Sequence, residues 1–230
     1  MSSAVAESVS AVDTAVLFAH VEDVASAEGH AAPGGFRELY KDGPEAHYKA
    51  AGNVYRNPHE AAIIKALNEA LVTYGLVRTP RTAAAAAAVV TPLTPACRIL
   101  DLAAGSGEAT LALESIGFRD VTGADPFTGA AYEARVGRPA QSWSFEDIAN
   151  SCLSETPTFR LAVCCYALHL VEPSWMYGVL YELAQACGYL MIISPHKKPD
   201  IPSSAPWSLV PPGELRVDRV HVRLYKSLLI

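Results

Sequence analysis

The sequence predicts an α/β fold organised around a nucleotide-binding sheet, and two observations lead to this prediction. In the stretch 97–113, a short apolar run containing Asp101 is followed by small residues at 103–107 and then by a helix-favouring segment. A strand, a tight glycine turn and a helix in this order open nucleotide-binding α/β sheets. From Cys97 onward, strand-like and helix-like segments alternate, which is typical of a parallel sheet.

The composition narrows the class of protein further. The 230 residues are half hydrophobic and carry a formal net charge of −6, which suits one sizeable α/β domain with an additional segment. No apolar run is long enough to cross a bilayer, residues 1–30 lack the pattern of a signal peptide, and no basic cluster could follow a phosphate backbone. Five cysteines without a Cys-x-x-Cys pair indicate free thiols in a reducing compartment. We therefore expect a cytoplasmic protein with no nucleic-acid or membrane partner and no bound metal.

The alternation from Cys97 onward predicts each element of the sheet. Strands are expected at 97–102, 119–124, 140–145, 160–166 and 188–194, and helices at 107–116, 127–135, 146–153 and 174–186. A sixth strand is placed around 207–210. The segment 216–226 alternates apolar and polar residues, which predicts a two-faced strand paired antiparallel at or near the sheet edge.

The region before the sheet is predicted to be helical in part. Residues 1–34 form a leader that is either flexible or a short helix, and 35–95 contain helices and a linker. The helix at 58–74 has an apolar face of helical period, with Asn57 as its N-cap and Pro58 at its first position. The sheet itself is expected to occupy 96–230.

The glycine turn indicates which nucleotide fits. A dinucleotide fingerprint requires Gly-x-Gly-x-x-Gly, but the third position counted from Gly105 is Thr110, and the Lys-Ser or Lys-Thr pair of a phosphate-binding loop is absent. The order Asp101-x-Ala-x-Gly-Ser-Gly107 resembles instead the first motif of class I S-adenosylmethionine-dependent methyltransferases, in which glycine stands at the position of Ala103. Small residues there allow a ligand to lie against bare backbone.

Three later segments follow the order of the same family. Residues 121–125 read as a strand ending in Asp125, Asp147 follows the third expected strand, and 161–172 contain a Leu-His pair after the fourth. The resemblance implies a Rossmann-like, doubly wound, mostly parallel sheet of seven strands with an antiparallel last strand. It also implies that 35–95 serve as a helical lid and linker, and that 96–230 form the S-adenosylmethionine-binding catalytic domain.

The resemblance assigns a cofactor site to the carboxyl ends of the strands. Asp125 would accept hydrogen bonds from both ribose hydroxyls, Asp147 would meet the adenine amino group, and Phe127 would cover one adenine face. A tyrosine or arginine of the lid would reach the cofactor's carboxylate. The cofactor-binding residues implied are Asp101, Ala103, Ala104, Gly105, Gly107, Asp125, Pro126, Phe127, Asp147, Ile148, Tyr166, Tyr48, Tyr55 and Arg56.

Two histidines are candidate catalytic bases, because imidazole exchanges protons near neutral pH. His169 could be a base or a residue that packs beneath the site, and His196 a base or a solvated loop residue beside two lysines. Trp207 and Leu168 are the candidates for contacting the substrate.

The function implied is methyl transfer from S-adenosylmethionine to an oxygen or nitrogen of a small molecule, by a monomer or homodimer. Two alternatives stay open at this point: methylation of a protein, and a catalytically inactive S-adenosylmethionine-binding partner subunit.

Overall fold

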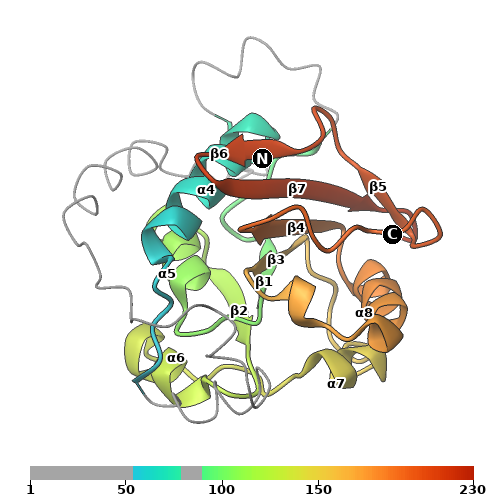
Figure 1. Cartoon of the computed structure of the whole chain (residues 1–230). Helices are drawn as coiled ribbons and strands as arrows, with labels where there is room; N and C mark the ends of the chain where they lie inside the picture. The colour runs from blue at the N-terminus through green and yellow to red at the C-terminus, as the bar shows by residue number, and fades with distance from the viewer. Residues whose placement is uncertain (1–53, 79–89) are drawn as a thin grey trace, which may run out of the picture.

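The computed structural model describes residues 54–78 and 90–230. The predicted leader and, within the predicted lid and linker, 35–53 with Tyr48 and 79–89 lie outside the described residues. The described residues form a seven-stranded sheet with the order β2-β1-β3-β4-β7-β5, in which β6 pairs with β7 (Figure 1). The strands are β1 (Arg98–Leu102), β2 (Asp120–Ala124), β3 (Leu161–Cys165), β4 (Tyr189–Ser194), β5 (Trp207–Leu209), β6 (Leu215–Val217) and β7 (Val220–Ser227). The first four are parallel, and β7 runs antiparallel to its three neighbours. The predicted α/β fold with a reversed last strand is confirmed.

Helices cover both faces of this sheet. They are α4 (Glu60–Thr73), α5 (Glu108–Ser115), α6 (Gly129–Val136), α7 (Phe145–Ala149), the short 3-10 helix η3 (Leu168–Leu170) and α8 (Pro173–Ala186). Strand residues contribute to two apolar cores, one shared with α4 and α5 and the other with α7 and α8. Figure 1 shows α4 and α5 together on one side and α7 and α8 together on the other. All six residues of β4 are buried, as expected for a central strand covered on both sides. The sheet is therefore doubly wound.

The helix α4 belongs to the first of these cores. Its buried residues recur at helical spacing, from Ile63 to Leu71. Tyr74, at its C-terminal end, donates a hydrogen bond from its hydroxyl to the carbonyl oxygen of Gly213 at 2.6 Å. The predicted N-cap is wrong: the cap residue is His59, and the Asn57 side chain accepts a hydrogen bond from the His59 amide at 2.9 Å. The helix therefore begins at Glu60, after a turn made by Asn57.

Two predicted strands differ from the structure. The third, at 140–145, is reduced to a single parallel bridge between Gln141 and Ala124, because the proline at 139 cannot donate to a ladder and Ser144 already caps α7. That helix ends at Ala149, four residues before its predicted end. The segment 216–226 is a hairpin of β6 and β7 rather than one strand. Asp218 has a φ of 53°, a left-handed conformation that aspartate tolerates in tight turns.

In the part of the chain that the structure describes, no helix has both the length and the apolar character that a membrane span requires.

Candidate functional site

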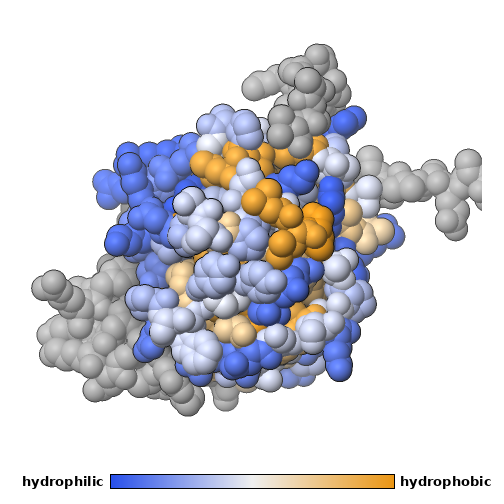
Figure 2. Space-filling view, turned by 90° about the vertical axis from the view of Figure 1, so that its right-hand side faces the viewer, coloured by the Kyte–Doolittle hydropathy of each residue, from blue (hydrophilic) through white to orange (hydrophobic). Residues whose placement is uncertain are grey.

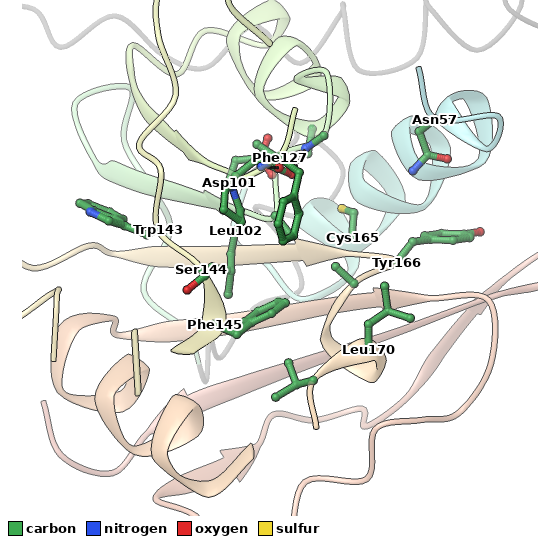
Figure 3. Close-up of a pocket in the computed structure, with 18 of the residues that line it drawn as sticks. Asn57, Asp101, Leu102, Phe127, Trp143, Ser144, Phe145, Cys165, Tyr166 and Leu170 are labelled. Carbon is green, nitrogen blue, oxygen red and sulfur yellow. Dashed lines mark hydrogen bonds between the residues drawn. The ribbon is translucent and has the colours of Figure 1, made fainter. Parts of the chain in front are cut away.

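A cavity of about 400 Å³ lies at the carboxyl ends of β1, β2 and β3 (Figure 3). This volume is within the range of small-molecule sites, about 300–1,000 Å³. The position is where open α/β sheets bind their ligands. Among the residues predicted for the cofactor, those that line the cavity are Asp101, Ala103, Ala104, Gly105, Asp125, Pro126, Phe127, Tyr166 and Tyr55. The structure thus brings together most of the site predicted from the sequence.

The turn after β1 has a backbone that glycine adopts most easily. Gly105 and Gly107 have φ values of 58° and 90°, and Ala103 has 56°. A Cβ atom on Gly107 would lie 2.5 Å from the Cγ2 atom of Val136, so this glycine allows the turn to pack against α6 and does not line the cavity. Ala103 occupies the left-handed region with a side chain, which is a strained conformation for alanine.

Asp125 ties the end of β2 to this turn. One carboxylate oxygen accepts a hydrogen bond from the Gly105 amide at 3.0 Å, and the other accepts from the amides of Phe127 at 2.9 Å and Thr128 at 3.0 Å. The Thr128 hydroxyl donates back to the Gly105 carbonyl at 2.7 Å. A carboxylate offers about four acceptor positions, so one is left for a ligand. Asp125 lines the cavity, and its role toward the ribose hydroxyls stays a prediction.

Asp101 is buried beneath the turn. Its Oδ2 atom accepts hydrogen bonds from the amide and the hydroxyl of Thr110, at 2.9 and 2.7 Å. Burial raises the pKa of Asp101 to about 7, and the nearby carboxylates of Glu108 and Asp125 act in the same direction. Asp101 thus carries a carboxyl group that exchanges its proton close to neutral pH.

Glu108, which the sequence analysis did not single out, connects three elements at the cavity. Only 4% of it is exposed, and it accepts hydrogen bonds from the Asn57 amide at 2.9 Å and the Ser106 hydroxyl at 2.6 Å. Arg135 of α6 lies 3.2 Å from Glu108 and 2.7 Å from Glu60 of α4. The only local signal was an acid in the first turn of a helix, which normally indicates a favourable charge for the helix dipole and nothing more.

The acid predicted to meet adenine, Asp147, lies outside the cavity lining. Asp147 does not line the cavity, because its carboxylate accepts from the amide and hydroxyl of Ser144 in a capping box, at 2.9 and 2.7 Å. These hydrogen bonds lower the pKa of Asp147. Ile148 is fully buried in the core with α8. Glu146 lines the cavity instead, beside Phe145.

Neither candidate base lines the cavity. The rings of His169 and His196 meet edge to face, with centroids 4.5 Å apart, outside the lining. Burial and the neighbouring His196 lower the pKa of His169 to about 4, so its ring is neutral at physiological pH. Its Nδ1 atom is buried without a hydrogen-bond partner, whereas His196 is exposed and lies 3.3 Å from the Ser194 hydroxyl. The geometry therefore favours the packing alternative for His169.

The two residues predicted to contact substrate are part of the core. Leu168 is 1% exposed, and the Trp207 indole donates to the Leu180 carbonyl at 2.8 Å. Trp143 and Trp175 line the cavity in their place. A tryptophan's exposure depends on which elements cover it, so sequence spacing could not distinguish the three.

The candidates before the sheet, Tyr55 and Arg56, also differ in whether they line the cavity. Tyr55 lines the cavity, and its ring lies so close to Gly105 that an added Cβ there would be 3.1 Å from the ring. Arg56 is largely exposed and pairs with Glu60 at 2.7 Å, outside the cavity. Tyr166 lines the cavity with a φ of 57° and stacks on His59, with ring centroids 5.2 Å apart.

The cavity is acidic and aromatic. Of the described residues that line it, none is basic, and five carry carboxyl groups: Asp101, Glu108, Asp125, Glu146 and Glu172. Aromatic rings come from Tyr55, Phe127, Trp143, Phe145, Tyr166 and Trp175. No cluster of three metal-ligating side chains occurs within 54–78 and 90–230. Such a lining favours a ligand that is cationic and partly aromatic.

Comparison with known proteins gives distant likenesses. No protein-family model matches the chain. An uncharacterized protein of Schizosaccharomyces pombe is 27% identical over 251 residues, covering 85% of this chain and 93% of that protein. An O-methyltransferase family protein from Burkholderia thailandensis has a TM-score of 0.49 and 14% identity. This match covers 74% of this chain and 58% of the Burkholderia protein, which is less than two thirds of that protein's length. Magnesium protoporphyrin IX methyltransferase from Synechocystis PCC 6803 has a TM-score of 0.46 and 15% identity, covering 83% of this chain and 88% of its own.

These likenesses are too distant to indicate a reaction, and the fold assignment rests on the strands themselves. The sheet has seven strands, its last strand is antiparallel, and its first strand leads through the turn at 103–107 into α5. The chain therefore has a Rossmann-like, doubly wound fold, as the resemblance of its sequence to class I S-adenosylmethionine-dependent methyltransferases implied.

Proposed function

We propose that the cavity binds S-adenosylmethionine and that the protein transfers the methyl group to an oxygen or nitrogen of a small molecule. The lining carries this proposal, because it combines carboxyl groups, aromatic rings and bare backbone. Carboxylates and aromatic faces attract a sulfonium, which is a cation. They would repel the pyrophosphate of a dinucleotide, which no basic side chain among the described lining residues could neutralise.

Five features of the cavity fit this cofactor. The backbone at 103–105 would face the amino-acid portion, and the remaining acceptor position of Asp125 would take one ribose hydroxyl. Phe127 would cover adenine, and Glu146 would accept a hydrogen bond from its amino group. Tyr55 would close the site over Gly105. These roles are proposed for this chain residue by residue.

When bound, S-adenosylmethionine supplies an electrophilic methyl group. The protein's contribution is then to hold the acceptor in line with that methyl group and to exclude water. Tyr166 and Trp175, which line the cavity after β3, would do this. Burial raises the pKa of Tyr166 to about 12, so its phenol stays protonated at neutral pH and can donate to the acceptor. Burial also raises the pKa of the Cys165 thiol well above its ordinary value, so this thiol is not proposed as a nucleophile.

Calorimetric titration of the full chain with S-adenosylmethionine and S-adenosylhomocysteine, with NAD as the control, tests the cofactor assignment. We expect saturable binding of the first two and none of NAD. Binding of NAD, or of none of the three, would contradict the proposal. Binding without methyl transfer to any small molecule or protein would instead support the inactive-partner alternative.

His169→Ala tests the part of the proposal that concerns the base. Because the ring lies outside the cavity lining, we expect lower thermal stability but less than about a tenfold decrease in kcat, whereas removal of a general base costs about 10²–10⁴-fold. A decrease of 100-fold or more with unchanged stability, rescued at higher pH, would restore His169 as the base.

A further inference from the structure

A second cleft, of about 430 Å³, lies at the opposite edge of the sheet, where the strands begin. Arg98 is the first residue of β1, Arg160 directly precedes β3, and Tyr189 is the first residue of β4. Lys226, near the end of the antiparallel β7, pairs in register with Tyr189. The cleft is lined by these four residues and by Phe159 and Thr158, among others. It is separate from the cavity at the carboxyl ends.

Two guanidinium groups in this cleft lie over aromatic rings. That of Arg98 lies over the Phe159 ring, 4.5 Å from the centroid, and that of Arg160 lies over the Tyr189 ring at 5.1 Å. A guanidinium over a ring face can still donate from its N–H groups to an oxyanion, and the contact restricts its orientation.

The two arginines are also neighbours across the sheet. The Arg160 amide donates to the Arg98 carbonyl at 2.8 Å, and the adjacent positions Ile99 and Leu161 are paired in register. Both side chains therefore leave the sheet on the same face. Like charges at neighbouring positions repel each other, so this arrangement is unfavourable unless an anion lies between them.

The cleft has more positive than negative charge. Arg98 lies 3.4 Å from Asp120 and donates to the Pro157 carbonyl. Neither Arg160 nor Lys226 forms an ion pair within the described parts of the chain. Three cations thus share one carboxylate, on a chain whose formal net charge is −6.

We propose that this cleft binds the phosphate group of a small soluble molecule. The Arg160 guanidinium and the Lys226 ammonium can donate to the oxygens of a phosphate, Arg98 adds positive charge beside them, and the Thr158 hydroxyl is a neutral donor at the same edge. Phe159, Tyr189 and Ile230 provide apolar surface for the rest of the molecule. Three basic side chains line the cleft, fewer than the phosphate contacts of a typical nucleic-acid site, which favours a small ligand over a nucleic acid.

Titration of the full chain with inorganic phosphate and with glycerol 3-phosphate, at constant ionic strength, tests the proposal by calorimetry. We expect saturable 1:1 binding that is independent of S-adenosylhomocysteine. In the double variant Arg160→Gln/Lys226→Gln, affinity should fall by at least about tenfold. The matched control, Lys197→Gln/Arg219→Gln, removes the same charge from exposed positions outside the cleft and should bind as the wild type does.

Tighter binding of glycerol 3-phosphate than of phosphate would identify an organic phosphate as the ligand class, and equal binding would identify the free anion. Non-saturable binding, or equal loss in both double variants, would overturn the proposal. If the first double variant does not fold, NMR of the wild-type chain replaces it. Phosphate should then shift the resonances of Arg160 and Tyr189, and shifts confined to other residues would contradict the site.

Discussion

The two halves of the cavity differ in how their carboxyl groups are held. After β1 and β2, Asp101, Glu108 and Asp125 are at most 9% exposed, and amides or hydroxyls of the chain donate to each of them. On the side of α7 and η3, Glu146 and Glu172 are exposed. Figure 3 shows Asp101 and Phe127 on one side of the cavity and Phe145 and Leu170 on the other.

This difference indicates that one half of the cavity is rigid and that the other can adapt to a ligand. The first half is assembled by hydrogen bonds within the fold, so it presents one fixed geometry to a ligand. The second half consists of more exposed side chains at α7, η3 and the start of α8, whose contacts a ligand would complete. Figure 2 shows apolar side chains exposed among polar ones on one face of the molecule. The exposed apolar residues of the described chain include Leu228 and Leu229.

Asp125→Ala should have the largest effect on ligand affinity, because it removes hydrogen bonds that hold the half of the cavity after β1 and β2. Three amides lose their acceptor, and the turn loses its link to β2. We expect the affinity for S-adenosylmethionine to fall by at least about 100-fold, as calorimetry would measure. Glu133→Ala, at an exposed position of α6, is the matched control. Wild-type affinity in Asp125→Ala would mean that the proposed cofactor site is wrong.

Asp101→Asn tests how the burial of this carboxyl group makes the stability of the fold depend on pH. In the folded state the pKa of Asp101 is raised to about 7 from 3.8, so between these values the native protein holds a proton that the unfolded chain has lost. Its contribution to stability is therefore present below pH 3.8 and is lost as the pH rises through about 7, at up to about 1.4 kcal/mol per pH unit. The variant, unfolded in urea at pH 4–8, should gain stability relative to the wild type as the pH increases. A constant difference would contradict the burial of an ionisable carboxyl here.

Glu146→Gln and Asp147→Asn compare two neighbouring acids of α7, on the exposed side of the cavity. Only Glu146 lines the cavity, so its substitution should weaken S-adenosylmethionine binding by about fivefold, the value of a single hydrogen bond. Asp147→Asn should leave the affinity unchanged and lower the stability by about 1 kcal/mol, because it alters the capping box of α7. The reverse pattern of affinities would return the adenine contact to Asp147.

Ala103→Gly should have the smallest effect. Glycine removes the strain of a left-handed φ of 56° at a cost of greater freedom in the unfolded chain, so a net gain of about 0.5 kcal/mol is expected in urea unfolding. Ala104→Gly, at the next position and without a positive φ, should instead lose about 0.5–1 kcal/mol. Equal changes in both variants would show that the turn is not strained at Ala103.

The sequence alone determined the class of fold and the chain segments that meet at the cavity. Strand and helix periodicity depend on residues a few positions apart, so β1 to β4 were predicted within one or two residues of their observed bounds. The glycine turn and Asp125 could be located because close backbone approach and a strand-end acid have local signatures.

Only the tertiary structure decided which side chains face the cavity. Whether Glu146 or Asp147 reaches it depends on where α7 begins, and whether Trp175 or Trp207 does depends on the helix that covers each. Glu108 became part of the site through a contact with Asn57, 51 residues away in the chain. Burial and side-chain direction arise from such distant contacts, which no local pattern in the sequence encodes.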